Sequence, residues 1–119
     1  MSNECTLLVN SCDNYSDTWT PFFKLLSKYW PDCPYKIVLN TESLSFKYND
    51  LNINTFSFYK EGKSVSWGRR VIRHLKKIET EFVLIVLDDF FIRANVDQAR
   101  IEECISWMKW SAPQKCIQH

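Results

Sequence analysis

The stretch 82–87, FVLIVL, runs directly into Asp88-Asp89 and decides the fold class of this chain. Six consecutive apolar residues, half of them Val or Ile, predict a strand that is buried on both faces. Strands of this kind lie in parallel sheets covered by helices on both sides, and we expect this one to be central. The stretch 5–10, CTLLVN, has the same nearly continuous apolar character and predicts a second buried strand.

Two further strands and three helices are expected around this pair. Strands are predicted at 35–39 and, at the sheet edge, at 53–58. Apolar residues at three- and four-residue steps predict helices over 19–30, over 64–79 and from about Asn95 onward, with Gln98 in a capping box. The buried faces expected for the second and third helices consist of Trp67, Val71, Ile72, Leu75 and Ile78, and of Ile101, Cys104, Ile105 and Met108.

Alternating strands and helices predict an α/β fold. We expect three αβα layers around a Rossmann-like, mainly parallel sheet of about four strands. The 119 residues fit one domain, over 1–110, followed by a tail over 111–119.

Composition excludes several classes of protein. Two glycines are too few for a Gly-rich dinucleotide or P-loop motif. A formal net charge of +1 argues against a nucleic-acid binder. Five cysteines without a CxxC pair indicate neither a zinc site nor a disulfide framework, and the longest apolar run is too short for a transmembrane segment.

Acidic residues follow two of the predicted strands. Asp13 comes soon after the first strand, and Asp88 and Asp89 come directly after the stretch 82–87. Ligands of open parallel sheets bind beyond the carboxyl ends of the strands, where paired carboxylates can hold Mg²⁺ or Mn²⁺. The alternative is that these acids are solvated or cap backbone N–H groups.

Cations gather in one region: the stretch 60–77 holds seven Lys or Arg residues and one acid. Arg69 and Arg70, in the first turns of the predicted helix, could bind phosphate groups. The alternative is a solvent-facing helix with Trp67 in the core. His74 is expected on the helix surface, and Cys12 is expected to be a structural thiol.

Two segments resemble a known family. LLVNSCDNYSDTWTPFFKLLSKYWPDCPYKIVLNTE at the start and SWGRRVIRHLKKIETEFVLIVLDDFFI further on resemble the N-terminal half of bacterial GT-A-type glycosyltransferases of surface-polysaccharide clusters. The resemblance implies a partial GT-A fold, a UDP- or GDP-linked sugar donor, glycosyl transfer to a hydroxyl acceptor, and Mn²⁺ or Mg²⁺. Nucleotide-binding positions implied in this way are Ser11, Cys12, Asp13, Arg69 and Arg70, and the implied metal ligands are Asp88 and Asp89.

The resemblance therefore predicts the donor-binding half of a glycosyltransferase, truncated before the part that would supply the catalytic base. The expected location is the cytoplasm or the inner face of the membrane. One alternative is a non-enzymatic α/β module that binds a partner protein, or a second copy of itself, through exposed apolar surface. A receiver-like phosphate-transfer site built on Asp13, Asp88 and Asp89 is the third hypothesis.

Overall fold

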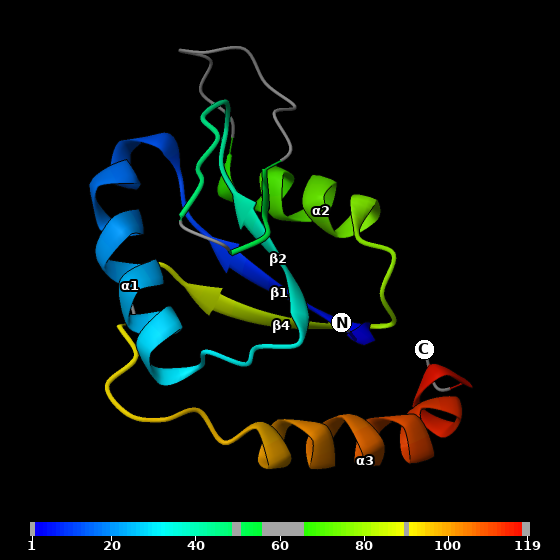
Figure 1. Ribbon diagram of the computed structural model, residues 1–119. Coiled ribbons are helices and arrows are strands. Elements are labelled where there is room, and N and C mark those ends of the chain that lie inside the picture. The colour runs from blue at the N-terminus through cyan, green and yellow to red at the C-terminus, as the bar shows by residue number, and fades with distance from the viewer. Residues whose placement is uncertain (1, 49–50, 56–65, 90, 118–119) are drawn as a thin grey trace.

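The computed structural model describes residues 2–48, 51–55, 66–89 and 91–117 (Figure 1). In chain order the elements are β1 (Ser2–Asn10), the 3₁₀ helix η1 (Asp13–Thr18), α1 (Trp19–Tyr29), β2 (Tyr35–Asn40), β3 (Ile53–Thr55), α2 (Trp67–Lys77), β4 (Phe82–Leu87) and α3 (Gln98–Ile117). The bounds of β1, α1 and β2 agree with the predicted strands and helix to within three residues. Residues 56–58 of the strand predicted over 53–58 lie outside the described residues.

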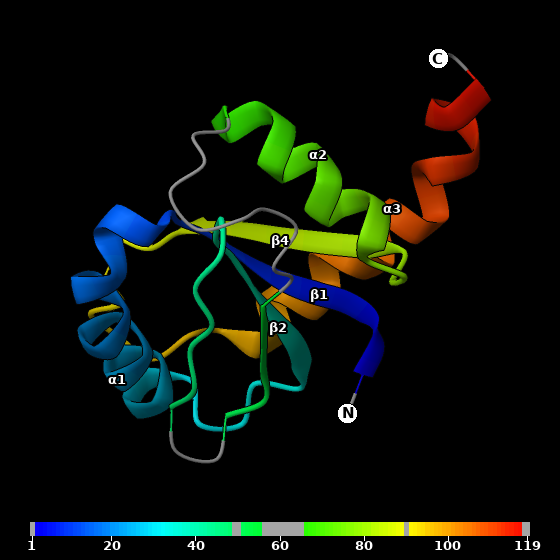
Figure 2. The same ribbon diagram turned by 90° about the horizontal axis from the view of Figure 1, so that it is seen from above.

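The four strands form one sheet in the order β3-β2-β1-β4, and every pairing is parallel. Helices α1 and α3 cover one face and α2 covers the other, so the molecule has three layers (Figure 2). The predicted α/β, Rossmann-like sheet of about four strands is thus confirmed. Among the described residues, no helix combines the length and the apolar character needed to cross a membrane.

The main core lies between the sheet and the layer formed by α1 and α3. Alternate side chains of β1, such as Leu7 and Val9, meet Phe22, Phe23 and Leu26 of α1, and all five are buried. Pro21 lies in the first turn of α1, where its missing N–H costs no hydrogen bond.

The strand β4 lies at an edge of the sheet, so the prediction of a central strand was wrong. Its neighbour is β1, and no described strand pairs with its other side. Ile85 is 49% exposed and Leu87 is 37% exposed as a result. An apolar run indicates that the side chains of a strand are suited to burial, but it does not indicate whether the strand has a neighbour on one side or on both.

Helix α2 presents a different face to the sheet from the predicted one. Arg70 and His74 are buried, whereas Ile72 and Leu75 are 55% and 38% exposed. The buried polar groups have partners: Arg70 Nη2 donates to the carbonyl of Ser11 at 3.0 Å, and His74 Nδ1 lies 2.8 Å from the carbonyl oxygen of Arg70. The prediction that His74 lies on the surface was wrong because hydrogen bonds offset the cost of burial.

The start of α3 is capped by Asp97 rather than through a capping box at Gln98. Asp97 Oδ1 accepts a hydrogen bond from the backbone N–H of Arg100 at 3.1 Å. Gln98 instead accepts from Trp30 Nε1 at 2.9 Å and donates to the hydroxyl of Tyr35 at 2.7 Å. These bonds tie α3 to the end of α1 and the start of β2.

The buried face of α3 is narrower than predicted. Ile105 is buried and Ile101 packs against the core, but Cys104 and Met108 are exposed. The helix also continues through residues 111–117, which were predicted to be a tail. Ile101 and Ile105 therefore provide its contact with the core, and further along the helix Lys109 forms an ion pair with Glu4 of β1.

Phe23→Ala is expected to lower the free energy of unfolding by about 3–5 kcal/mol, because it empties a fully buried site between α1 and the sheet. The measurement is urea unfolding followed by circular dichroism. Lys24→Ala, on the exposed side of the same helix turn, is the control and should change stability by less than about 0.5 kcal/mol. Equal effects of the two substitutions would show that α1 is not packed as described.

Candidate functional site

The candidate site lies at the carboxyl ends of the strands. All four strands are parallel, so these ends meet at one edge of the sheet. Ser11 follows β1, Thr41 follows β2 and Asp88 follows β4, and all three are buried. Helix α2 begins at the same edge, since Arg70 in its first turns reaches Ser11. This is the edge at which parallel α/β sheets bind ligands.

A hydrogen-bonded cluster of Ser11, Thr18, Trp19 and Asp88 joins three elements there. The hydroxyl of Ser11 donates to Asp88 Oδ2, and the hydroxyl of Thr18 donates to the same oxygen at 3.1 Å. Trp19 Nε1 donates to Ser11 Oγ at 2.7 Å. The other oxygen of the carboxylate, Oδ1, receives no hydrogen bond from the described part of the chain. Asp88 thus has one oxygen engaged and one left for a further partner.

Arg70 brings a positive charge to this cluster. Its guanidinium donates to the carbonyl of Ser11, which is the residue whose hydroxyl contacts Asp88. Arg70 is 4% exposed and Asp88 is 7% exposed, so both charged groups are held in a region with little water. Three predicted site residues, Ser11, Arg70 and Asp88, are therefore brought together.

Asp13 lies apart from that cluster and fastens the loop after β2. Its Oδ1 accepts from the backbone N–H groups of Glu42, Ser43 and Leu44 at 3.2–3.3 Å, and its Oδ2 accepts from the Ser43 hydroxyl at 2.7 Å. The backbone N–H of Asp13 donates in turn to Glu42 Oε1 at 2.9 Å. Partial burial by itself would raise the pKa of Asp13, but the four hydrogen bonds outweigh it and lower the pKa below its ordinary value.

The remaining predicted residues lie at the rim of the site. Asp89 and Arg69 are exposed, and Cys12 is half-buried with a free thiol. The backbone N–H of Arg69 donates to Ser66 Oγ at 3.4 Å, which makes Ser66 the N-cap of α2. Arg69 thus lies in the first turn of a capped helix.

The acidic residues at this edge are few, but their oxygen atoms are of the type that binds hard divalent cations. The described residues contain no group of three or more His, Cys, Asp or Glu side chains that could hold a metal. Asp88 Oδ1 and the exposed carboxylate of Asp89 are oxygen ligands of the kind that Mg²⁺ and Mn²⁺ prefer. Such ions are commonly held by one or two carboxylates together with water and the phosphates of a ligand, and Asp88 and Asp89 are the carboxylates that could take this part.

Two buried asparagines beside the cluster were not predicted. Asn10 and Asn40 are paired in register at the ends of β1 and β2, and Asn40 Nδ2 donates to Asn10 Oδ1 at 2.9 Å. Asn10 Nδ2 and Asn40 Oδ1 have no hydrogen-bond partner among the described residues, although both residues are almost fully buried. The available signal was that each buried strand ends in a polar amide.

His74 was also missed as a buried group. Burial lowers its pKa below the ordinary value of 6.5; the hydrogen bond to the Arg70 carbonyl opposes this in part, and the charge of Arg70 adds a smaller lowering effect. The imidazole, on the face of α2 that lies against the sheet, is therefore harder to protonate than that of an exposed histidine. A histidine flanked by cations gave no signal in the sequence that it faces inward.

Comparison with known proteins adds no family assignment. No protein-family model, no curated protein and no solved structure matches the chain. Functional conclusions therefore depend on the side chains at the strand ends.

His74 is expected to make folding stability depend on pH between 7.5 and 5. Because its pKa is lowered in the folded state, the unfolded chain takes up a proton below about pH 6.5 that the folded chain resists. The free energy of unfolding should fall as the pH is lowered through this range, and His74→Gln should lose that part of the decrease. Urea unfolding at several pH values provides the measurement.

Lys76→Gln, at an exposed position of the same helix, supplies the control. It should retain the full decrease in stability on acidification. If His74→Gln retained the decrease as well, the lowered pKa of the buried His74 would be contradicted.

Proposed function

We propose that this chain is the donor-binding half of a glycosyltransferase that takes a UDP- or GDP-linked sugar and acts in surface-polysaccharide synthesis in the cytoplasm. The observation that carries this proposal is the convergence of Ser11, Arg70 and Asp88 at the carboxyl edge of a parallel sheet. A buried cation and a buried carboxylate that both contact Ser11 suit a ligand that contains both a diphosphate and a metal ion.

Asp88 and Asp89 would hold the divalent cation, Mn²⁺ or Mg²⁺. Ser11 and Thr18 hold Oδ2 of Asp88 in place, which leaves Oδ1 directed away from these hydroxyls as the ligating atom. Asp89 is exposed and can reach an ion at the rim. When bound, the cation would neutralise charge on the diphosphate leaving group.

Arg69 and Arg70 would divide the recognition of the diphosphate. Arg69 is exposed in the first turn of α2, where its guanidinium and the N-terminal end of the helix both favour an anion. Arg70 is committed to Ser11, so it contributes a fixed positive field behind the site. The turn Ser11-Cys12-Asp13 would face the nucleotide, with Asp13 keeping that turn rigid through its contacts to the loop after β2.

The second candidate function is a non-enzymatic module that binds a partner protein. The observation in its favour is the exposed apolar surface of β4 and α2, which includes Ile72, Leu75, Ile85 and Leu87. A module of this kind would need no nucleotide and no metal.

Calorimetric titration of UDP and GDP in the presence of Mn²⁺ tests the donor-binding proposal. One of the nucleotides should bind in the micromolar range, and Arg69→Ala should weaken binding about tenfold because a charge-assisted contact to phosphate is lost. Arg73→Ala, one turn further along the same exposed helix, is the matched control and should bind nearly as the natural chain does. An absence of heat with both nucleotides would contradict the proposal.

The acidic pair is tested separately through its metal dependence. Asp89→Asn should abolish the difference between titrations with and without Mn²⁺, since the exposed ligand is removed without disturbing the Ser11–Asp88 contact. Glu79→Gln, an exposed acid before the other end of β4, should leave the difference intact. Retention of full metal dependence by Asp89→Asn would show that the metal site lies elsewhere.

A further inference from the structure

The outer side of β4 has backbone groups that pair with no strand in the part of the chain that the structure describes. The backbone N–H of Asp88 donates to the carbonyl of Asn10 at 3.3 Å. This bond shows which residues of β4 turn their peptide groups toward β1 in the parallel ladder. In such a ladder alternate residues turn both peptide groups toward the neighbour. Residues 82, 84 and 86 therefore face β1, and the N–H and C=O groups of Val83, Ile85 and Leu87 face away from it.

This outer edge lacks the features by which proteins protect edge strands. The residues of β4 are all apolar, and the strand contains no Lys, Pro or Gly. At the opposite edge of the sheet, the described residues of β3 are Ile53, Asn54 and Thr55, two of which are polar. The described parts of the two edges thus differ in polarity, and the open side of β4 is suited to strand pairing.

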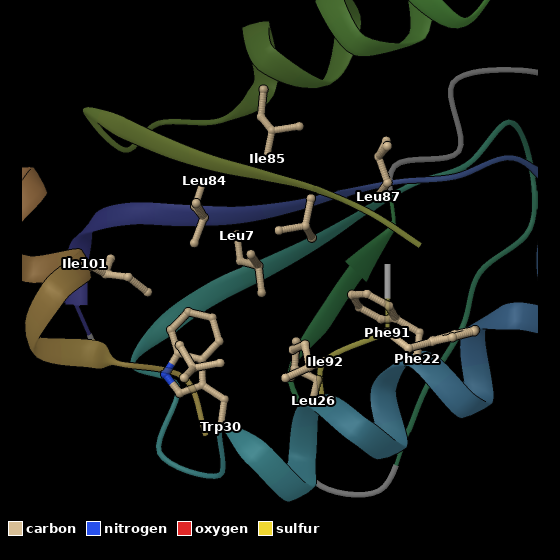
Figure 3. Close-up of a pocket in the computed structure, with 12 residues that line it drawn as sticks. Leu7, Phe22, Leu26, Trp30, Leu84, Ile85, Leu87, Phe91, Ile92 and Ile101 are labelled. Carbon is tan, nitrogen blue, oxygen red and sulfur yellow. The ribbon is translucent and has the colours of Figure 1, made fainter. Parts of the chain in front are cut away.

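Apolar hollows lie along the same edge, on the side of α1 and α3. A cavity of about 580 Å³ extends between β4, β1, α1 and the segment 91–101, and its lining is entirely apolar. Figure 3 shows Leu84, Leu7 and Leu26 directed into it, whereas Ile85 points toward α2. A second cavity of about 170 Å³ shares Leu84 and Ile101 with the first, and its lining is apolar apart from Arg100. The two cavities therefore adjoin below β4.

A strand paired with β4 would find apolar contacts on both of its faces. Its side chains alternate between the two sides of the sheet. One set would enter the cavities beside Leu84, and the other would cover Ile85 and Leu87 on the side of the sheet that carries α2. The exposed side chains of Ile85 and Leu87 and the two cavities are then parts of one docking surface, which we call the β4 edge.

The charges at the ends of β4 indicate which strand fits. The exposed Glu79 and Glu81 precede the strand and the exposed Asp89 follows it, so acids lie at both ends. An antiparallel copy of β4 would bring Glu81 against the acids of the other copy, and a parallel copy in register would bring like residues together. Like charges placed opposite one another are unfavourable, so self-pairing is disfavoured and basic flanks are favoured.

We propose that the β4 edge binds an extended apolar segment of another protein, about six residues long and flanked by Lys or Arg, by adding it to the sheet as a fifth strand. Main-chain hydrogen bonds to Val83, Ile85 and Leu87 provide the pairing, and the cavities accept alternate side chains of the segment. The terminal acids select for basic flanks. This surface is distinct from the cluster of Ser11, Arg70 and Asp88.

The test uses a fluorescent synthetic peptide in which about six alternating Val and Thr residues are flanked by lysine pairs. Fluorescence anisotropy should show saturable binding at micromolar protein concentration. The same peptide with glutamate pairs in place of lysine should bind at least tenfold more weakly. Equal binding of both peptides, or of neither, would overturn the proposal.

Variants locate the binding on the strand. Ile85→Pro removes an outward N–H that takes no part in the ladder with β1, and Ile85→Lys places a charge on the apolar edge. Each should weaken peptide binding at least tenfold. Leu44→Lys is the matched control, because Leu44 is a similarly exposed apolar residue away from β4, and it should bind within twofold of the natural chain. Unchanged binding by Ile85→Lys would place the site elsewhere.

Two further measurements separate the remaining outcomes. Light scattering of the chain alone should show no dimer at micromolar concentration, and a dimer that Ile85→Lys dissociates would mean that the β4 edge pairs with a second copy instead. Nucleotide titration of folded Ile85→Lys should match that of the natural chain. A loss of nucleotide binding in that variant would contradict the independence of the two surfaces.

Discussion

The hydrogen bond between the Ser11 hydroxyl and the Asp88 carboxylate is the contact on which the carboxyl edge of the sheet depends. It joins residues that are 77 positions apart in the chain, and it fixes the ends of β1 and β4 relative to each other. Trp19 and Thr18 add the start of α1 to the same point. A buried carboxylate that lost these donors would carry a large desolvation cost, so the cluster keeps the three elements together.

The orientation of α2 follows from the same cluster. Arg70 reaches the carbonyl of Ser11, and the carbonyl of Arg70 in turn lies against His74. Two polar residues consequently occupy the face of α2 that an amphipathic pattern would assign to Ile72 and Leu75. The displaced apolar side chains of Ile72 and Leu75 remain exposed on α2 as a result.

The sheet has two different surfaces, the carboxyl edge where the strands end and the β4 edge along its side. The carboxyl edge is polar and gathers charged groups around a fixed backbone, as suits a small anionic ligand. The β4 edge is apolar and offers unpaired backbone groups, as suits an extended chain. Figure 1 shows that β4 contributes to both, since its last residue leads into Asp88 while its length runs along the open side.

The sequence alone determined the element order, the four strands, the parallel α/β class and the grouping of acids at strand ends, because periodicity and apolar runs are local properties. It also gave Ser11, Arg70 and Asp88 as candidate site residues, and the structure brings these three together. Tertiary structure decided that β4 lies at the edge, that α2 turns Arg70 and His74 inward, and that Asp13 fastens a loop apart from Asp88. These features depend on hydrogen bonds between residues far apart in the chain, such as Ser11 with Asp88 and Arg70 with Ser11. A local pattern contains no information about such distant partners, and therefore it cannot predict which face of a helix or which side of a strand they will occupy.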